Sequence, residues 1–259
     1  MKILFFDIET SPNILAAWSL YDNFAGFQQI IKERSILCAS WKWQGENKIY
    51  SVGVHESKRR FVKDVFDDFY VIKTLHGVLS KADVIVTQNG DRFDIRFFNA
   101  RALYHGLDPV KPCVTIDTLK GLRKHFKFNT NKLDYVAQFL GLGAKTPTGG
   151  MSLWIAIIND KNPLELRLDA MKRLVQYNQN DVRLLEQLYD KISPWMKTHP
   201  SLNLISGVKD GCVRCLSKEI KKNGLHYTGT GIYQAYKCKK CGKWMRGTER
   251  IGKGSIRSI

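Results

Sequence analysis

The sequence of 259 residues has no run of 18 consecutive apolar residues, which argues against a membrane-spanning helix. Its first apolar stretch, residues 3–6, is stopped by Asp7 and is too short for a secretory signal. We therefore expect a cytoplasmic protein without a membrane partner. The chain also shows no internal repeat and no low-complexity segment.

Acidic residues are scarce relative to basic ones. The chain has 24 Asp and Glu against 41 Lys and Arg, a formal net charge of +17. An excess of this size indicates a polyanionic partner, most simply nucleic acid. The alternative is a basic protein whose charge only keeps it soluble.

The positive charge is concentrated near the C-terminus. Residues 208–259 hold 13 Lys and Arg and 3 Asp and Glu, a balance of +10, which leaves +7 for the other 207 residues. Four of the six cysteines lie in the same stretch. This change in composition predicts a large domain over residues 1–200, a small module over 208–247 and a basic tail over 248–259.

Apolar periodicity predicts an α/β fold for the large domain. We expect strands at residues 2–7, 35–43, 49–54, 84–87 and 114–116. Helices are expected at residues 61–80, 91–104, 133–140 and 163–192. Three early strands followed by alternating helices and strands indicate one mixed sheet flanked by helices.

Carboxylates follow two of these strands and recur in the last helix. Asp7 and Glu9 are two residues apart on a strand and so share a face, although such a pair is often merely solvated. Asp94 follows the strand at residues 84–87 and can equally well occupy the first turn of a capped helix. Tyr177 and Asp181 lie one helical turn apart, a spacing that is common by chance.

Together these segments carry a family resemblance. FDIET at residues 6–10, NGDRFD at 89–94 and YNQND at 177–181 resemble the three motifs of the DnaQ-like, or DEDD, 3′–5′ exonuclease superfamily. The middle motif resembles the proofreading domains of family B DNA polymerases. The resemblance spans roughly residues 1–192 and implies an RNase H-like fold with a five-stranded sheet. Gln176 stands where one branch of that superfamily has histidine, so the chain is similar to the tyrosine branch.

The resemblance also implies a role for each motif residue. Two Mg²⁺ or Mn²⁺ ions would be held by four carboxylates, namely Asp7, Glu9, Asp94 and Asp181. Such ions activate water and stabilise the leaving 3′ oxygen, and oxygen ligands suit them. Tyr177 would orient the water, because a phenol is a poor base at neutral pH. Thr10, Asn89 and Phe93 would line the site and contact substrate, or else serve only as turn and packing residues.

The cysteines near the C-terminus have the spacing of a structural zinc site. Two C-x2-C pairs, Cys212 with Cys215 and Cys238 with Cys241, are separated by 22 residues and supply four thiolates. The pattern resembles a zinc ribbon with one Zn²⁺. A redox pair would need a thioredoxin-like surrounding, and disulfides conflict with a missing signal sequence. Cys38 and Cys113 lie in apolar contexts and are expected to be packed thiols.

The small module combines basic and aromatic residues. Its basic residues can contact phosphates, while its aromatic residues can stack on bases or form its small core. These residues are Lys237, Lys239, Lys240, Lys243 and Arg246 with Tyr233, Tyr236 and Trp244. The expected partner is a nucleic acid with a single-stranded or frayed 3′ end.

The function expected from these patterns is metal-dependent 3′–5′ exonuclease activity, with DNA favoured by the polymerase-like motif. An exoribonuclease and a non-catalytic nucleic-acid-binding or scaffold protein are the alternatives. Too few residues follow the last helix for the palm and fingers of a polymerase. A free-standing nuclease is therefore expected, or a proofreading subunit of a separate polymerase or other replication protein.

Overall fold

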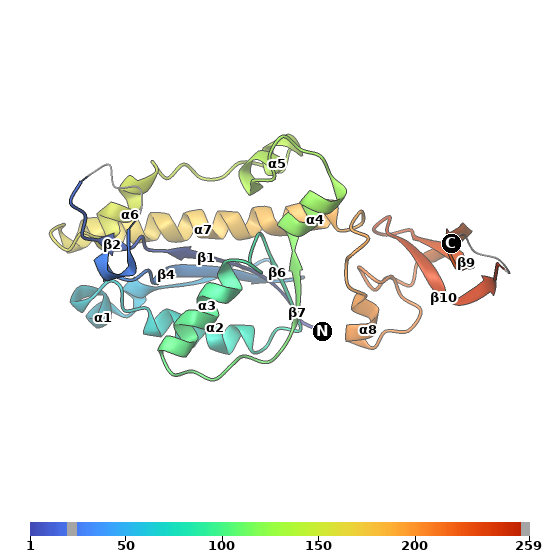
Figure 1. The fold of residues 1–259 in the computed structure, drawn as a ribbon, viewed down its shortest axis with the longest axis horizontal. Helices are drawn as coiled ribbons and strands as arrows, with labels where there is room; N and C mark the ends of the chain where they lie inside the picture. The colour runs from blue at the N-terminus through green and yellow to red at the C-terminus, as the bar shows by residue number, and fades with distance from the viewer. Residues whose placement is uncertain (20–24, 255–259) are drawn as a thin grey trace. The chain divides into compact units, whose positions relative to one another are not determined.

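The structure is a computed structural model that describes residues 1–19 and 25–254 (Figure 1). Its contacts divide the chain into two compact units. The larger unit comprises Lys2–Leu119 and Phe128–Leu188. The smaller unit comprises Met1, Lys120–Lys127 and the chain from Tyr189 onwards. None of the described helices has the length and apolar composition needed to cross a bilayer.

A mixed sheet of five strands forms the centre of the larger unit. Its strands lie in the order β5-β4-β1-β6-β7. They are β1 Ile3–Thr10, β4 Ile36–Trp43, β5 Tyr50–Gly53, β6 Val84–Thr87 and β7 Val114–Asp117. Strand β4 is antiparallel to β1 and β5, whereas β6 is parallel to β1 and β7. The expected mixed five-stranded sheet is confirmed, and each of the five predicted strands is present. A short pair, β2 Ile14–Leu15 and β3 Ile30–Lys32, lies outside this sheet.

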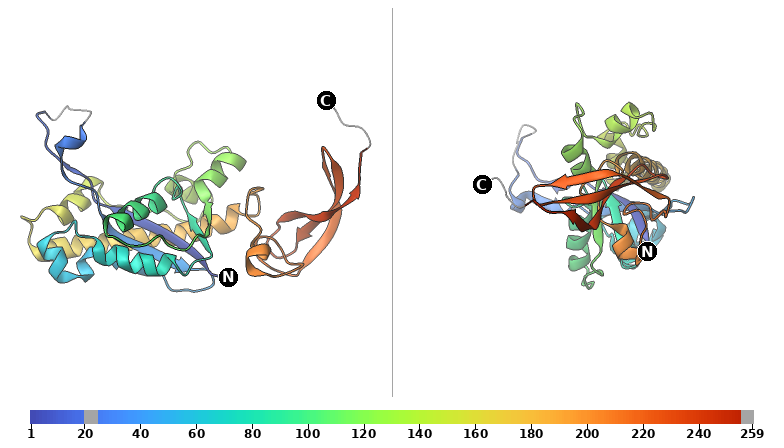
Figure 2. Two further views of the ribbon diagram at one scale, coloured as in Figure 1. Left: turned by 60° about the horizontal axis from the view of Figure 1, so that its bottom comes forward. Right: turned by 90° about the vertical axis from the view of Figure 1, so that its right-hand side faces the viewer.

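Helices flank both faces of the sheet (Figures 1 and 2). They are α1 Lys58–Lys63, α2 Phe69–Leu79, α3 Asp94–Tyr104, α5 Leu133–Phe139, α6 Met151–Ile158 and α7 Leu164–Ile192. Most of a further helix, α4 Thr118–His125, belongs to the smaller unit. Helices α2 and α3 lie on one face, and α7 runs along the other. Helices α4 and α6 had no counterpart in the sequence-based expectation.

The single amphipathic helix expected over residues 61–80 is wrong. The segment forms α1 and α2, separated by residues 64–68. The carboxylate of Asp68 is completely buried and accepts hydrogen bonds from the Ile36 backbone N–H at 2.9 Å and from the Arg101 guanidinium at 2.7 and 2.8 Å. These partners are distant in sequence, so apolar periodicity alone does not reveal the break.

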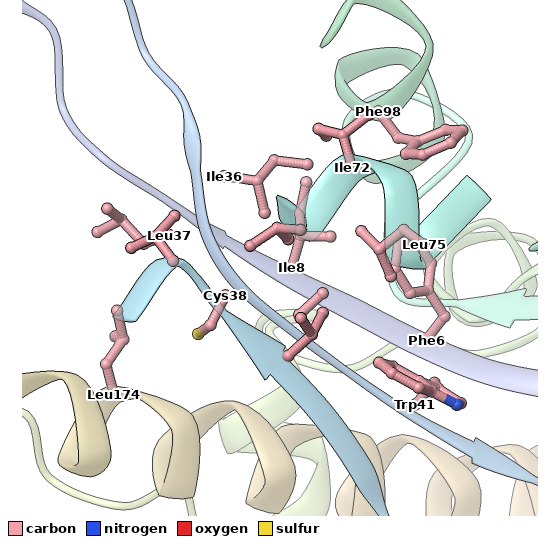
Figure 3. Close-up of a cluster of buried hydrophobic side chains, with 14 of the residues drawn as sticks. Phe6, Ile8, Ile36, Leu37, Cys38, Trp41, Ile72, Leu75, Phe98 and Leu174 are labelled. Carbon is pink, nitrogen blue, oxygen red and sulfur yellow. The ribbon is translucent and has the colours of Figure 1, made fainter. Parts of the chain in front are cut away.

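Alternation along the second half of β1 separates two apolar residues from two carboxylates. Phe6 and Ile8 are buried on the side of the sheet that faces α2 and α3 (Figure 3). They lie in a cluster with Ile72, Leu75 and Phe98. Asp7 and Glu9 have the opposite parity and therefore project towards α7. The central strand thus holds both carboxylates on a rigid support.

The smaller unit contains a second, three-stranded sheet. Strands β8 Ile220–Thr228, β9 Gly231–Cys238 and β10 Trp244–Gly252 are antiparallel in the order β10-β9-β8, and α8 Leu202–Ser206 precedes them. The domain limits expected at residues 1–200, 208–247 and 248–259 remain predictions. Strand β10 includes the first residues of the expected basic tail, and residues 255–259 lie outside the described residues.

Candidate functional site

Three carboxylates from two distant parts of the chain meet in the larger unit. Asp7 and Glu9 come from β1, and Asp181 comes from α7. One carboxylate oxygen from each lies within 4.8 Å of the other two. The packing of α7 against the sheet brings the first and third motifs together.

Asp94, the fourth expected carboxylate, lies beside this trio. It is the first residue of α3, is 3% exposed, and its Oδ1 accepts a hydrogen bond from the Ile8 backbone N–H at 3.2 Å. Its charge is among the causes that raise the pKa of Asp7. Asp94 therefore contributes to the same acidic cluster while it also joins α3 to the central strand.

Burial and mutual repulsion disfavour the ionised form of these acids. Burial first, and then the charges of Asp94, Glu9 and Asp181, raise the pKa of Asp7 well above its ordinary value. Burial and the Asp181 charge raise the pKa of Glu9 to about 8. Burial raises the pKa of Asp94 to about 7, against the lowering effect of its backbone hydrogen bonds. A bound cation would relieve this repulsion.

The donor set fits divalent cations such as Mg²⁺ or Mn²⁺. Hard cations of this kind prefer carboxylate oxygens, and the cluster offers three such groups within reach of one another. The Oδ1 atom of Asp181 is buried and accepts no hydrogen bond from any described residue. A buried acceptor without a donor is costly, and a metal ion would satisfy it.

Lys145 is a member of the site that the sequence-based analysis missed. It lies in the loop between α5 and α6, and its Nζ donates to the Tyr177 hydroxyl at 2.8 Å and to the Asp181 carboxylate. Burial lowers the pKa of Lys145, but the Asp181 ion pair and the hydrogen bonds raise it above the ordinary value overall. A lone lysine in a loop carries no sequence signal that could have identified it.

Tyr177 is held by contacts on several sides. Its ring meets Trp154 edge-to-face at 6.4 Å between centroids, and the Lys145 ammonium lies 4.9 Å from the ring centroid. Burial and the neighbouring Asp181 carboxylate raise the pKa of Tyr177 to about 12. The hydroxyl therefore stays protonated at neutral pH, and the expected positioning role stays a prediction.

Asn178 is a second residue that the analysis of motifs overlooked. Its side chain is fully buried, and its Nδ2 donates to Asp7 Oδ2 at 2.6 Å. The helix α7 therefore supplies both a carboxylate and the amide that orients a carboxylate of β1. Gln176, the position that distinguishes the two branches of the family resemblance, is exposed.

The turn before α3 is fixed by backbone contacts. Asn89 adopts a left-handed conformation with φ of 69°, and its N–H donates to Asp117 Oδ1 at 2.9 Å. A Cβ atom on Gly90 would lie 2.3 Å from Thr87 Oγ1, so only glycine fits there. Among the described residues, the side chain of the N-cap residue Phe93 forms no hydrogen bond that caps α3. This turn sets the position of Asp94, and the expected substrate contact of Asn89 stays a prediction.

Arg34 connects the other two residues expected to line the site. Its Nη2 donates to Thr10 Oγ1 at 2.7 Å, and its guanidinium carbon lies 5.2 Å from the Phe93 ring centroid and 5.4 Å from that of Phe97. Thr10 and Phe93 thus occupy one polar and aromatic surface, which carries a positive charge that the motifs did not indicate.

A model of the RNase H superfamily matches residues 42–193, which is more than half of the chain. The chain belongs to the RNase H superfamily. The match includes Asp94, Tyr177 and Asp181, whereas Asp7 and Glu9 precede it.

The RNase H-superfamily chain also resembles a solved polymerase. The structure of the family B DNA polymerase from the hyperthermophilic archaeon Pyrobaculum calidifontis superposes with a TM-score of 0.52 at 18% identity. The alignment covers 90% of this chain and 31% of the polymerase, a likeness that establishes the fold alone. No curated protein matches the sequence.

The superfamily match ends before the four cysteines of the smaller unit. The sulfurs of Cys212, Cys215, Cys238 and Cys241 all lie within 4.8 Å of one another. The separation is 3.6 Å between Cys212 and Cys241 and 3.7 Å between Cys215 and Cys238. A disulfide is about 2.05 Å long, whereas a tetrahedron with Zn–S bonds of about 2.3 Å has edges of about 3.8 Å. The cluster therefore has the size of a four-thiolate metal site.

Both cysteine pairs lie on the same type of turn. The residue after each pair is left-handed, Leu216 with φ of 61° and Gly242 with φ of 75°. Their N–H groups donate to the carbonyls of Cys212 and Cys238 at 3.0 and 3.1 Å. Glycine adopts this conformation readily at residue 242, and Leu216 adopts it despite its side chain. Of the other two cysteines, Cys38 is buried as expected and Cys113 is half-buried.

Proposed function

We propose that this chain is a metal-dependent 3′–5′ exonuclease of the tyrosine branch of the DEDD group, with DNA as the favoured substrate. The observation that carries the proposal is the meeting of Asp7, Glu9 and Asp181 within 4.8 Å, with Tyr177 one turn before Asp181. Membership of the RNase H superfamily and the likeness in fold to a family B DNA polymerase support a nuclease.

The carboxylates of Asp7, Glu9, Asp94 and Asp181 would hold two Mg²⁺ or Mn²⁺ ions. Such ions supply an activated water and neutralise charge on the leaving oxygen. The chain provides the positions of these groups: Asn178 orients Asp7, and the backbone of β1 orients Asp94. The protein therefore enforces the placement of the acids before any substrate arrives.

Tyr177 and Lys145 complete the proposed machinery. The Tyr177 hydroxyl stays protonated and can donate a hydrogen bond to the attacking water or to a phosphate oxygen. The Lys145 ammonium fixes that hydroxyl and also offsets charge on Asp181. Arg34, Thr10 and Phe93 form the adjacent surface, on which a terminal nucleotide can be held by stacking and by its phosphate.

The direct test is cleavage of a 5′-labelled single strand with Mg²⁺ or Mn²⁺. We expect a ladder that shortens from the 3′ end and that is lost in Asp7→Ala and in Asp181→Ala chains. A strand with a blocked 3′ end should resist, and circular single-stranded DNA should remain intact. Cleavage of the circle would show that the chain is an endonuclease. A ladder that persists in Asp7→Ala protein would show that the acidic cluster does not catalyse the cleavage.

DNA and RNA strands of the same sequence, compared in this assay, show which polymer is the preferred substrate. We expect faster cleavage of DNA. Faster cleavage of RNA would make the chain an exoribonuclease. No cleavage of either polymer with either metal would favour a non-catalytic nucleic-acid-binding role.

We also propose one structural Zn²⁺ at the four cysteines of the smaller unit, as in a zinc ribbon. The S–S separations and the two matching turns support it. A separate polymerase or replication protein remains a proposed partner, because the chain spans about a third of the polymerase that it resembles. Co-elution of the purified chain with a polymerase from the same source would support that partner.

A further inference from the structure

The strand register of the smaller unit places its basic and aromatic residues on definite faces of the sheet. Lys237 of β9 pairs with Lys221 of β8 and Trp244 of β10. Paired residues in adjacent strands point to the same side, and alternate residues of one strand share a side. Two residues before Lys237, Ala235 pairs with Arg246. These residues therefore belong to one face.

The same face continues along β9. Tyr233, two residues before Ala235, pairs with Arg250 of β10. We call this surface the basic-aromatic face. It consists of Lys221, Tyr233, Lys237, Trp244, Arg246 and Arg250. Tyr236 has the opposite parity and pairs with Lys222 and Met245 on the other side of the sheet.

The four cations of the basic-aromatic face have no acidic partner within the described chain. None of Lys221, Lys237, Arg246 and Arg250 forms a salt bridge with a carboxylate of the described residues. Lys243 differs, because it is 6% exposed and its Nζ donates to the Met196 carbonyl at 2.5 Å. Lys243 is therefore an internal residue, and the face itself has the excess positive charge.

Aromatic rings on the face are held by these cations. The Arg246 guanidinium lies 4.0 Å from the Tyr233 ring centroid, and the Lys237 ammonium lies 5.5 Å from that of Trp244. Tyr233 is 9% exposed, whereas Trp244 is 53% exposed. A large indole that is open to solvent beside unpaired cations can stack on a base whose phosphates those cations contact.

We propose that the basic-aromatic face binds single-stranded nucleic acid, with Trp244 stacking on a base and the four cations contacting the backbone. A polyanion is favoured because the face has four unpaired positive charges. A single strand is favoured over a duplex because only unpaired bases expose a ring for Trp244. The proposal does not rest on cleavage, since no residue of the face belongs to the acidic site.

The test is equilibrium binding of a fluorescent oligonucleotide to the full chain without added Mg²⁺ or Mn²⁺, with salt varied. Each phosphate contact contributes about −0.7 to the slope of log K against log salt for single strands. We expect Lys221→Ala to weaken binding and to make the slope less steep by about 0.7. Lys222→Ala, the neighbouring residue on the opposite face, is the matched control and should leave the slope unchanged.

Substitution of Trp244 distinguishes the contribution of stacking to the binding affinity from the contribution of charge. We expect Trp244→Leu to weaken binding about tenfold with the same salt slope, and Trp244→Tyr to retain most of the affinity. Trp195→Leu, at an exposed indole outside the face, is the control. One retained zinc per chain and an unchanged melting temperature show that each variant is folded.

Three results would overturn the proposal. Equal effects of Lys221→Ala and Lys222→Ala would mean that the charge of the whole unit, and not this face, binds the strand. Unchanged affinity in folded Trp244→Leu protein would eliminate stacking. Equal competition by a blunt duplex or by polyglutamate of matched charge would show that the face does not prefer single strands. Each of these results is independent of whether the chain cleaves.

Discussion

The Nζ atom of Lys145 lies 2.8 Å from the hydroxyl oxygen of Tyr177, to which it donates a hydrogen bond while it also pairs with Asp181. One loop lysine therefore links two residues of α7 that are a full turn apart. The link places the phenol and the carboxylate in a fixed relation to each other.

Loss of this lysine should slow the proposed reaction more than it weakens substrate binding. We expect Lys145→Met to lower kcat about 10- to 100-fold, the usual effect of removing a group that orients a ligand. The metal concentration needed for half-maximal rate should shift as well, which a purely structural role would not cause. Lys161→Met, an exposed loop lysine, is the control. An unchanged kcat and an unchanged metal requirement would show that Lys145 has no part in the site.

Removal of the Tyr177 hydroxyl should affect rate without affecting the fold. Tyr177→Phe keeps the ring contact with Trp154 and removes the hydroxyl's hydrogen bonds with Lys145 and Asp181, each of which contributes about 1 kcal/mol to stability. We expect a kcat lower by about 10-fold or more and a melting temperature within a few degrees of the original. Because the pKa of Tyr177 is about 12, the pH–rate profile of the unmodified chain should show no ionisation of this group below pH 10. Full activity in Tyr177→Phe protein would contradict the positioning role.

Stability without added Mg²⁺ or Mn²⁺ should fall as pH rises from 5 to 8. The ordinary pKa values of Glu9 and Asp94 are 4.5 and 3.8, and the folded chain raises them to about 8 and about 7. The folded state therefore holds more protons than the unfolded state in this window, so a higher pH favours unfolding. Added Mg²⁺ should raise the melting temperature more at pH 8 than at pH 5.

A comparison with Glu9→Gln isolates the contribution of that group. His199 acts in the opposite direction, because burial lowers its pKa to about 4 and stability then rises between pH 4 and 6.5. Subtracting the melting temperature of one protein from that of the other at each pH cancels the contribution of His199 and of every other group that both proteins share. We expect the fall in melting temperature to be smaller in Glu9→Gln. An identical pH profile in both proteins would show that Glu9 is already ionised in the folded chain.

Zinc removal should unfold the smaller unit. We expect about one tightly held zinc per chain by elemental analysis and its loss in Cys238→Ser. Cys113→Ser changes a half-buried thiol outside the cluster and should retain the metal. Proteolysis should then cut Cys238→Ser protein within the smaller unit and leave Cys113→Ser protein intact. A zinc-free smaller unit that resists proteolysis would refute the structural role.

The sequence by itself determined the five strands of the mixed sheet and the carboxylates and cysteines of the two candidate sites. The β-branched and aromatic residues before Asp7 predicted the central strand, and the motifs that resemble the DEDD superfamily pointed to Asp94, Tyr177 and Asp181. The C-x2-C pairs likewise predicted a compact cluster, because their spacing suits a short turn. Local physics decides such features, so a local pattern reveals them.

Only the tertiary structure decided which further residues join these sites. Lys145, Asn178 and Arg34 reach the acids and the aromatic surface through contacts with residues 24 to 171 positions away in the chain. The break at Asp68 has the same origin, since its partners Ile36 and Arg101 are remote in sequence. A hydrogen bond between distant segments depends on how the sheet and helices pack, and no periodicity within one segment encodes that packing.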